Sequence, residues 1–323
     1  MSEPIGQHLV PRCYLKNFAL SKNKDWLIDA CNVQVDDTKI FNVNIKAVCK
    51  QKEFYTFKKL PDGDKRFLEK FYSKTVEADY AQVYNLLMNG DNISPNDRFK
   101  IIAFVICQYW RTAKYINAIN NIFTSSIQHG YNLIQSQGLE KKIHFDGGGA
   151  ISFENKTVDE VIKEQKEDTR EGYNVDSFNR FKDLTSRRIN DRIVVYEAHP
   201  GDFFITSDNP VKTAHNIYDP TGTIKMPINH KYMVGLLPSN DDPTFRNRKL
   251  HRIKLDYERS YFECLGNNFM QIEQADVVIL GKKSCLEKAL QDYKTFDEDV
   301  FNVRFDRFYK NLEEENAFLN SQL

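Results

Sequence analysis

One stretch decides the fold: residues 93–111, ISPNDRFKIIAFVICQYWR. Ser94 is a favoured N-cap and Pro95 suits the first helical position, so the stretch predicts a helix that begins there and runs past Arg111. The apolar run 101–106 is far shorter than the roughly 20 residues of a membrane span. We therefore expect a central helix packed inside a protein.

Helical spacing continues on both sides of this segment. Residues 67–88 carry apolar side chains at helical intervals with one wet face. We expect residues 115–137 to continue as helix. Residues 155–191 are charged and sparsely apolar, which is typical of one or two solvated helices. Two shorter helices are expected at 256–272 and 284–293.

Strand patterns lie at the two ends of the chain. We expect strands at 26–30 and, from alternating aromatics, at 53–57. Further strands are expected at 193–196, 203–206, 232–237 and 277–280. The pattern predicts an α+β fold with short N-terminal strands, a helical middle region and a C-terminal, mostly antiparallel sheet. If the N-terminal strands join that sheet, the chain forms one interleaved domain.

Composition narrows the function classes. The 323 residues contain 45 Lys and Arg against 45 Asp and Glu, so the net charge of the chain does not indicate nucleic-acid binding. A local basic face is still compatible with this composition. A content of 41% hydrophobic residues argues against disorder. Six scattered cysteines form no Cys-x-x-Cys pair, which favours free thiols in a cytoplasmic protein. No apolar span or signal segment indicates a membrane partner.

Several nucleotide and hydrolase motifs are absent. The chain has no phosphate-binding loop with a Gly-Lys-Ser/Thr ending, no dinucleotide fingerprint, no nucleophile elbow and no His-Glu-x-x-His zinc motif. The cofactor is therefore unknown from sequence, and a divalent metal stays open.

Three short motifs carry a resemblance to a known family. The N-terminus reads His8-x-x-Pro11-x-x-Tyr14-Leu15-x-x-Phe18, residues 204–211 read FITSDNPV, and residues 108–112 read QYWRT. Together they resemble the DUF4238 family, bacterial proteins of unknown function. The resemblance runs from His8 to about Leu280.

With the element pattern, the resemblance implies a single domain over 1–295. Its parts are expected to be a strand-rich 1–60, a helical 65–137, a variable charged insertion at 138–191 and a sheet-rich 192–295. An acidic C-terminal tail, frayed in our interpretation, is expected at 296–323.

His8 is the first candidate for chemistry. Imidazole titrates near neutral pH and can serve as base, acid or metal ligand. Pro11 would fix the chain after it, and Tyr14, Leu15 and Phe18 would anchor the segment in the core. The alternative is that His8 only makes a local hydrogen bond.

Asp208 and Asn209 are next, at the end of the expected strand 203–206. Asp208 could accept a proton, orient His8 or bind a metal, and Asn209 could donate to an oxyanion. However, Ser-Asp-Asn-Pro is also a favourable turn, because Asp and Asn bond nearby backbone and Pro ends the strand.

Arg111 and Gln108 lie three residues apart on the central helix, so both can face one way. A guanidinium suits a phosphate or carboxylate ligand, and a buried one needs a partner. The alternative is an internal ion pair, for instance with Glu69 or Glu77 of the preceding helix.

A basic run without acids follows at 246–254, RNRKLHRIK. It contains Arg246, Arg248, Lys249 and Arg252, which could contact a nucleic-acid backbone. A solvated loop leading into a helix is the plainer interpretation.

Taken together, His8, Arg111 and Asp208 hold a base, an anion clamp and an orienting carboxylate, an inventory that suits phosphodiester hydrolysis. We therefore hypothesise a cytoplasmic nuclease-type effector; the resemblance to an uncharacterised bacterial family extends this to antiphage defence or toxin-like roles. The rival hypothesis is a non-catalytic module, or homo-oligomer, that binds a protein or an anionic small molecule. If the enzyme hypothesis holds, the three side chains should line one open cleft.

Overall fold

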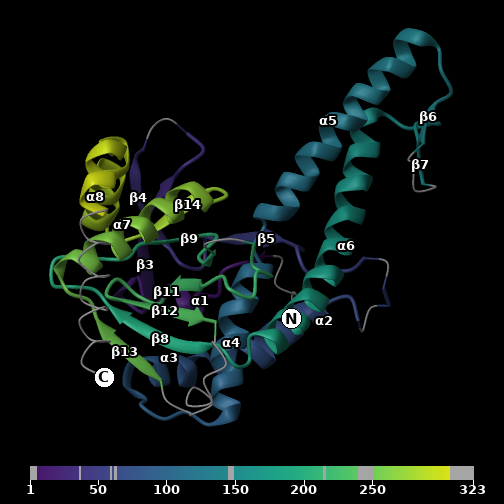
Figure 1. Ribbon diagram of the computed structural model, residues 1–323. Coiled ribbons are helices and arrows are strands. Elements are labelled where there is room, and N and C mark those ends of the chain that lie inside the picture. The colour runs from purple at the N-terminus through teal and green to yellow at the C-terminus, as the bar shows by residue number, and fades with distance from the viewer. Residues whose placement is uncertain are drawn as a thin grey trace.

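The computed structural model describes residues 6–35, 38–58, 60–61, 64–144, 149–213, 216–238 and 250–305. Within these ranges the chain is mixed helix and sheet, with short N-terminal strands, central helices and largely antiparallel sheets (Figure 1). The helices are α1 (Arg12–Leu15), α2 (Phe67–Phe71), the π-helix η1 (Tyr72–Glu77), α3 (Tyr80–Asn89), α4 (Pro95–Trp110), α5 (Lys114–Gln137), α6 (Val158–Arg187), α7 (Tyr257–Gln274) and α8 (Lys283–Lys294).

Two five-stranded sheets hold most of the strands. The first has the order β10 (Lys212–Thr213), β11 (Ile224–Pro227), β12 (Tyr232–Leu237), β8 (Arg192–Glu197) and β13 (His251–Lys254), in which only β13 runs parallel to its neighbour. The second has the order β2 (Leu20–Lys22), β3 (Asp25–Asn32), β14 (Val278–Gly281) and β9 (Thr206–Ser207), with β4 (Ile40–Asn44) also paired to β3.

The second sheet joins the two ends of the chain. Residues of β3 pair antiparallel with β14, from Asn32 opposite Val278 to Asp29 opposite Gly281. The N-terminal strands therefore enter a sheet completed by C-terminal strands, and the domain is interleaved. Two small ribbons complete the strands: β1 (Gly6–His8) with β5 (Lys50–Lys52), and β6 (Lys142–His144) with β7 (Ala150–Ser152).

The central helix α4 begins at the predicted N-cap but does not run past Arg111 as predicted: it ends at Trp110, because Arg111 leaves the helical conformation with φ −89° and ψ 0°. Ser94 accepts from the Asp97 backbone and Asp97 accepts from the Ser94 backbone, a capping box that satisfies two of the free donors at the helix start. Every residue from Ile101 to Trp110 is buried. The helix is thus the axis around which the main core is built.

Helices α5 and α6 form a long arm that extends away from the sheets, with the β6–β7 ribbon near its far end (Figure 1). A small separate cluster, centred on Ile127, Ile134, Phe153 and Val161, packs this arm together. The charged segment that was expected to be a variable insertion therefore includes one continuous helix, α6, which also contacts α4.

Three further local predictions were wrong. Residues 53–57 form turns and loop, not a strand: Glu53 has φ 51°, and Arg170 donates to the carbonyls of Glu53, Phe54 and Thr56, which a strand would use in a ladder. The expected strand 203–206 shortens to Thr206–Ser207.

The helix expected at 67–88 is divided by η1, because a π-turn inserts there. The C-terminal end also differs from a frayed tail as far as residue 305. The rings of Phe301 and Phe305 meet the Phe262 ring of α7 edge to face, and Arg304 pairs with Glu258.

Candidate functional site

The N-terminal motif is anchored as its residues suggest. Tyr14, Leu15 and Phe18 are buried, and the Tyr14 hydroxyl donates to the Pro227 carbonyl while sharing a hydrogen bond with Thr206 Oγ1. Pro11 is the N-cap of α1. These contacts hold the end of β1, and with it His8, against strands that come two hundred residues later.

His8 is half-buried at the end of β1, opposite Lys50 of β5. Its Nε2 is shielded from solvent and has no hydrogen-bond partner among the residues that the structure describes. The Ile45 backbone also lies close enough to the ring to affect its pKa. Burial lowers the pKa of His8, and the cations Arg12 and Lys50 lower it further, against opposing effects of Ile45 and Glu77. At neutral pH His8 is therefore an uncharged imidazole with an acceptor nitrogen left over.

Arg111 lies beside His8 and is buried, with only 2% of it exposed. Its Nη2 donates to the His8 carbonyl at 2.8 Å and to Glu77 Oε1 at 2.9 Å. The guanidinium also lies 4.7 Å from the centre of the Tyr72 ring, a cation–π contact. The internal ion pair considered from sequence is thus present, with Glu77 as the partner.

Gln7 fixes the other wall of this pocket. Its amide Nε2 donates to Glu69 Oε2 at 2.8 Å and to Thr56 Oγ1 at 3.2 Å. Its Oε1 accepts from the Tyr55 backbone at 2.6 Å. Consecutive residues of β1 thus serve different purposes, since Gln7 ties the ribbon to Glu69 of α2 whereas His8 Nε2 has no partner among the described residues.

These side chains enclose one polar hollow of about 270 Å³, which we name the His8 pocket. It is lined by Gly6, Gln7, His8, Arg12, Tyr55, Glu69, Tyr72, Ser73, Glu77 and Arg111. Arg12 stands at its rim as an exposed cation, and Glu77 is 29% exposed. The pocket thus contains a base, a buried cation held by a carboxylate, and a second cation that is free to meet a ligand.

The π-helix explains why two of these side chains meet Arg111. Tyr72 and Glu77 stand five residues apart, at the two ends of η1. In an α-helix such residues point about 140° apart, whereas an i→i+5 turn brings them to one side. The π-turn therefore places the Tyr72 ring and the Glu77 carboxylate against the same guanidinium.

Asp208 does not join this pocket. Its carboxylate accepts from the backbone N–H groups of Asp276, Val277 and Val278 at 2.8, 2.8 and 3.1 Å. Burial raises the pKa of Asp208 to about 6, although these three donors oppose the shift. Asp208 borders a different hollow, of about 420 Å³, so the expectation that His8, Arg111 and Asp208 line one cleft is not met.

Asn209 and Gln108 are also internal. Asn209 accepts from Thr112 Oγ1 at 3.1 Å and donates to the Gln274 carbonyl at 3.1 Å, so its amide links the turn after α4 to the end of α7. Gln108 is fully buried, and neither of its amide atoms has a partner among the described residues. Neither side chain lines the His8 pocket, and their expected contact with a substrate has no counterpart in this geometry.

The basic run divides in two. Arg246, Arg248 and Lys249 lie outside the described residues. Arg252 donates to the carbonyls of Leu86, Leu87 and Gly90, so it closes the C-terminal end of α3 and does not face a ligand.

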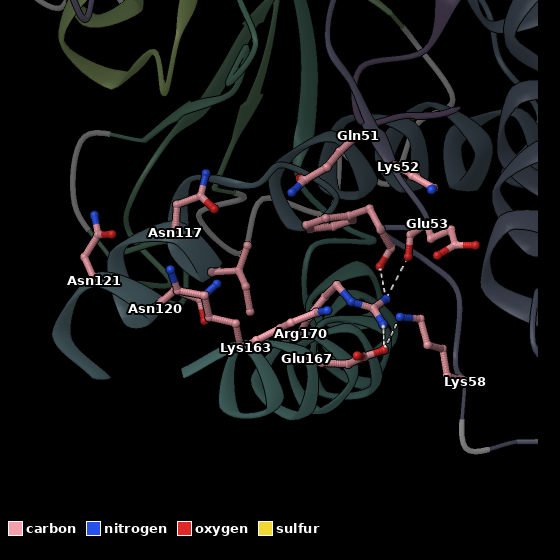
Figure 2. Close-up of a pocket in the computed structure, with 13 residues that line it drawn as sticks. Gln51, Lys52, Glu53, Lys58, Asn117, Asn120, Asn121, Lys163, Glu167 and Arg170 are labelled. Carbon is pink, nitrogen blue, oxygen red and sulfur yellow. Dashed lines mark hydrogen bonds and ion pairs between the residues drawn. The ribbon is translucent and has the colours of Figure 1, made fainter. Parts of the chain in front are cut away.

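A larger groove, of about 580 Å³, lies where β5 meets α5 and α6 (Figure 2). Lys58 is paired there with Glu167 at 2.6 Å, and Arg170 is occupied by backbone carbonyls. Lys52, Lys163 and Lys166 are exposed at its edge. Among its described lining residues the groove has no histidine, and the carboxylate of Glu167 is paired with Lys58 and Arg170, so it offers charge without an obvious reaction. Across the described ranges, no group of three or more His, Cys, Asp or Glu side chains is arranged to hold a metal ion.

Comparison with known proteins was made against families, curated proteins and solved structures. A family model described as a protein of unknown function, DUF4238, matches residues 6–285. The chain belongs to the DUF4238 family. The match spans the N-terminal motif, the central helix and the Ser-Asp-Asn-Pro segment, and so includes every residue of the His8 pocket. No curated protein and no solved structure matches this DUF4238 chain. In the part of the chain that the structure describes, no helix is both long and apolar enough to cross a bilayer.

Sequence reasoning missed six residues of the DUF4238 pocket: Gly6, Gln7, Arg12, Tyr55, Tyr72 and Ser73. Arg12 lies inside the N-terminal motif, and its position one residue after Pro11 was the available signal. Tyr72 and Ser73 gave none, because their approach to the pocket depends on the π-turn, which the helical spacing of residues 67–88 conceals.

Proposed function

We propose that this DUF4238 protein is a hydrolase of phosphodiesters, a nuclease-type effector, with His8 as its general base. The observation that carries the proposal is the buried, unpartnered Nε2 of His8 in a pocket that also holds Arg111, Glu77 and Arg12. Buried polar atoms without partners are uncommon and call for an explanation, and a missing ligand atom is one.

Each residue has a distinct role in this proposal. A water molecule attacks phosphorus, and its proton passes to His8 Nε2; the bond from phosphorus to the leaving oxygen breaks, and the imidazolium returns the proton to that oxygen. Arg12 stabilises the negative charge on the phosphoryl oxygens. Arg111 and Glu77 are positioning residues, because Arg111 holds the His8 carbonyl and Glu77 holds Arg111.

The proposal does not use Asp208. It therefore replaces the mechanism expected from sequence, in which Asp208 took part. A role in a bacterial defence or toxin-like system, inside the cytoplasm, remains part of the proposal and follows from the activity if it is found.

The test is induced expression in a bacterial host, with the wild-type protein beside His8→Ala and Asp276→Asn, followed by gels of total RNA and DNA. We expect the wild type and Asp276→Asn to arrest growth and degrade nucleic acid, and His8→Ala to do neither. Purified proteins are compared by circular dichroism to show that His8→Ala is folded. An intact nucleic-acid pool with the wild type, in cells and with purified protein, would overturn the proposal.

A second function is favoured by one observation. Two polar side chains selected from sequence, Asp208 and Asn209, are satisfied internally, as in a rigid binding module. In that case the His8 pocket binds an anionic group without turning it over. Saturable binding of a phosphate ester that is recovered unchanged would support this alternative over hydrolysis.

A further inference from the structure

A second hollow adjoins the His8 pocket and is more cationic. Its volume is about 450 Å³, and it shares Arg12, Ser73 and Glu77 with the His8 pocket, so the two are continuous. We name it the Trp26 pocket. Beyond Arg12 it adds three lysines and one indole ring.

The geometry points to a binding site for single-stranded nucleic acid in the Trp26 pocket, with the strand leading into the His8 pocket. This inference rests on the proposed function, since it names the substrate class of the same site. Proteins that bind single strands combine cations that follow the phosphates with aromatic rings on which bases stack. The Trp26 pocket contains both.

The cations outnumber the acids. Lys16, Lys24 and Lys46 line the pocket together with Arg12, and Glu77, which is already paired with Arg111, is the one carboxylate in the lining. Lys46 contacts Asp25 at 3.0 Å, but both side chains are largely exposed, so this pair is weak. In a chain without net charge, such a local excess of cations selects for an anionic ligand.

The ring and one lysine are held in fixed positions. Asn23 and Lys24 have φ 49° and 68° and form the two-residue turn between β2 and β3, the conformation typical of a tight hairpin. Trp26 follows at once in β3, and Lys16 Nζ lies 5.5 Å from its ring centre. The half-buried indole of Trp26 lies at the start of a hairpin that carries cations. A nucleobase can stack on this ring, and the phosphates on either side of that nucleobase would then lie near the cations.

One backbone segment joins the two pockets. The N–H of Ile45 donates to the Trp26 carbonyl at 3.0 Å, and the Ile45 backbone lies close enough to the His8 ring to affect its pKa. A base on Trp26 would therefore have its neighbouring phosphate near Arg12 and His8. The number of nucleotides bound is small, because the two hollows together measure about 720 Å³.

The test uses fluorescein-labelled twelve-nucleotide single strands of RNA and DNA and the matching duplex, with fluorescence anisotropy over a range of salt concentrations. The protein is the full chain carrying His8→Ala, so that cleavage does not interfere. We expect single strands to bind more tightly than duplex, and Trp26→Ala to weaken binding about tenfold. The double change Lys16→Ala/Lys24→Ala should reduce the salt slope by about 1.4.

The control is the double change Lys163→Ala/Lys166→Ala in the groove of Figure 2, two exposed lysines that do not line the Trp26 pocket. It should leave binding unchanged. Absence of binding, or loss of binding only in this groove variant, would overturn the inference. Trp26→Phe should retain most of the affinity, which separates stacking from a folding defect.

The two proposals fail separately. Binding at Trp26 without cleavage by the wild-type chain leaves the binding site and removes the hydrolase. Cleavage by the wild type that is unaffected by Trp26→Ala and Lys16→Ala/Lys24→Ala leaves the hydrolase and removes the Trp26 site.

Discussion

At the scale of single residues, His8 and Asp208 are both ionisable side chains that the sequence selects, but they differ in what surrounds them. His8 keeps one nitrogen without a partner at the edge of a pocket, while both oxygens of Asp208 are occupied by backbone donors. The sequence could identify both as unusual, because each lies in a distinctive motif. It could not predict that one would keep an unpartnered atom and the other would be fully hydrogen-bonded. That difference depends on which backbone groups folding brings near each side chain.

The protonation of His8 should respond to its neighbours in a predictable direction. Its pKa lies below 6.5, so cleavage by the wild type should fall as pH drops through that lowered value. Lys50→Ala removes a cation that lowers the pKa and should move the acid limb to higher pH, whereas Glu77→Gln should move it lower. NMR titration of the imidazole checks both shifts without requiring activity. A His8 pKa unchanged in both variants contradicts the electrostatic account.

Asp208→Asn should reduce stability and leave the His8 pocket intact. The new amide group must face backbone donors, so at least one buried N–H loses its acceptor, at a cost of about 1–3 kcal/mol in the free energy of unfolding. Urea unfolding measures this loss. The substitution Asp276→Asn, which changes a partly buried side chain, should lower the free energy of unfolding less. An equal loss would contradict the role given to the three backbone hydrogen bonds that Asp208 accepts.

The pH dependence of the same measurement has a definite sign. The folded pKa of Asp208 is raised to about 6, so between about pH 4 and 6 the folded chain retains a proton that the unfolded chain has lost. This group therefore makes the protein less stable as pH rises across that window. The decline should be missing in Asp208→Asn, and its persistence there would assign it to other groups.

At the scale of elements, η1 is the feature that builds the pocket wall. Apolar residues at helical intervals over 67–88 predict one long helix, and most of that range is helical. The π-turn was not predictable, because hydrophobic spacing reports which side is buried and not the hydrogen-bond pattern between turns. What favours the π-turn is the contact of Tyr72 and Glu77 with Arg111, residues far from η1 in sequence.

Deletion of Lys74, an exposed residue of η1, should convert the π-turn to a regular α-helix. Tyr72 and Glu77 would then stand four residues apart and still share one side of the helix, so we expect Arg111 to keep its carboxylate and both the free energy of unfolding and cleavage to change little. Chemical denaturation and a cleavage assay measure the two effects. The substitution Lys74→Ala keeps the π-turn and should also alter neither; a loss of stability or cleavage in the deletion variant alone would show that the pocket needs the π-turn itself.

At the scale of the whole molecule, the interleaving of the chain ends determines how it folds. The sequence predicted an α+β fold from strand patterns at both ends and helical spacing between them. It also allowed the N-terminal strands to join the C-terminal sheet. It could not predict which strands pair, because β3 and β14 are separated by more than two hundred residues and their register depends on side chains from both.

Because β3 is completed by β14, neither half of the chain should fold alone. We expect fragments 1–191 and 192–305, expressed separately, to lack a cooperative thermal transition, and co-expression to restore one. Circular dichroism with temperature provides the measurement. A stable, cooperative 1–191 fragment would show that the helical middle and N-terminal strands form an independent unit.

The same pairing has a consequence during protein synthesis. All residues of the His8 pocket lie before position 112, whereas β14 begins at Val278. At 5–20 residues per second, a ribosome takes about 10–30 s to add the residues between them. Throughout that interval the nascent chain carries the complete set of pocket side chains. During the first part of it, Tyr14 lacks its hydrogen-bond partners Thr206 and Pro227. Until the end of it, β3 lacks its neighbouring strand β14. A newly made molecule would thus acquire a fixed His8 only when its translation is nearly finished.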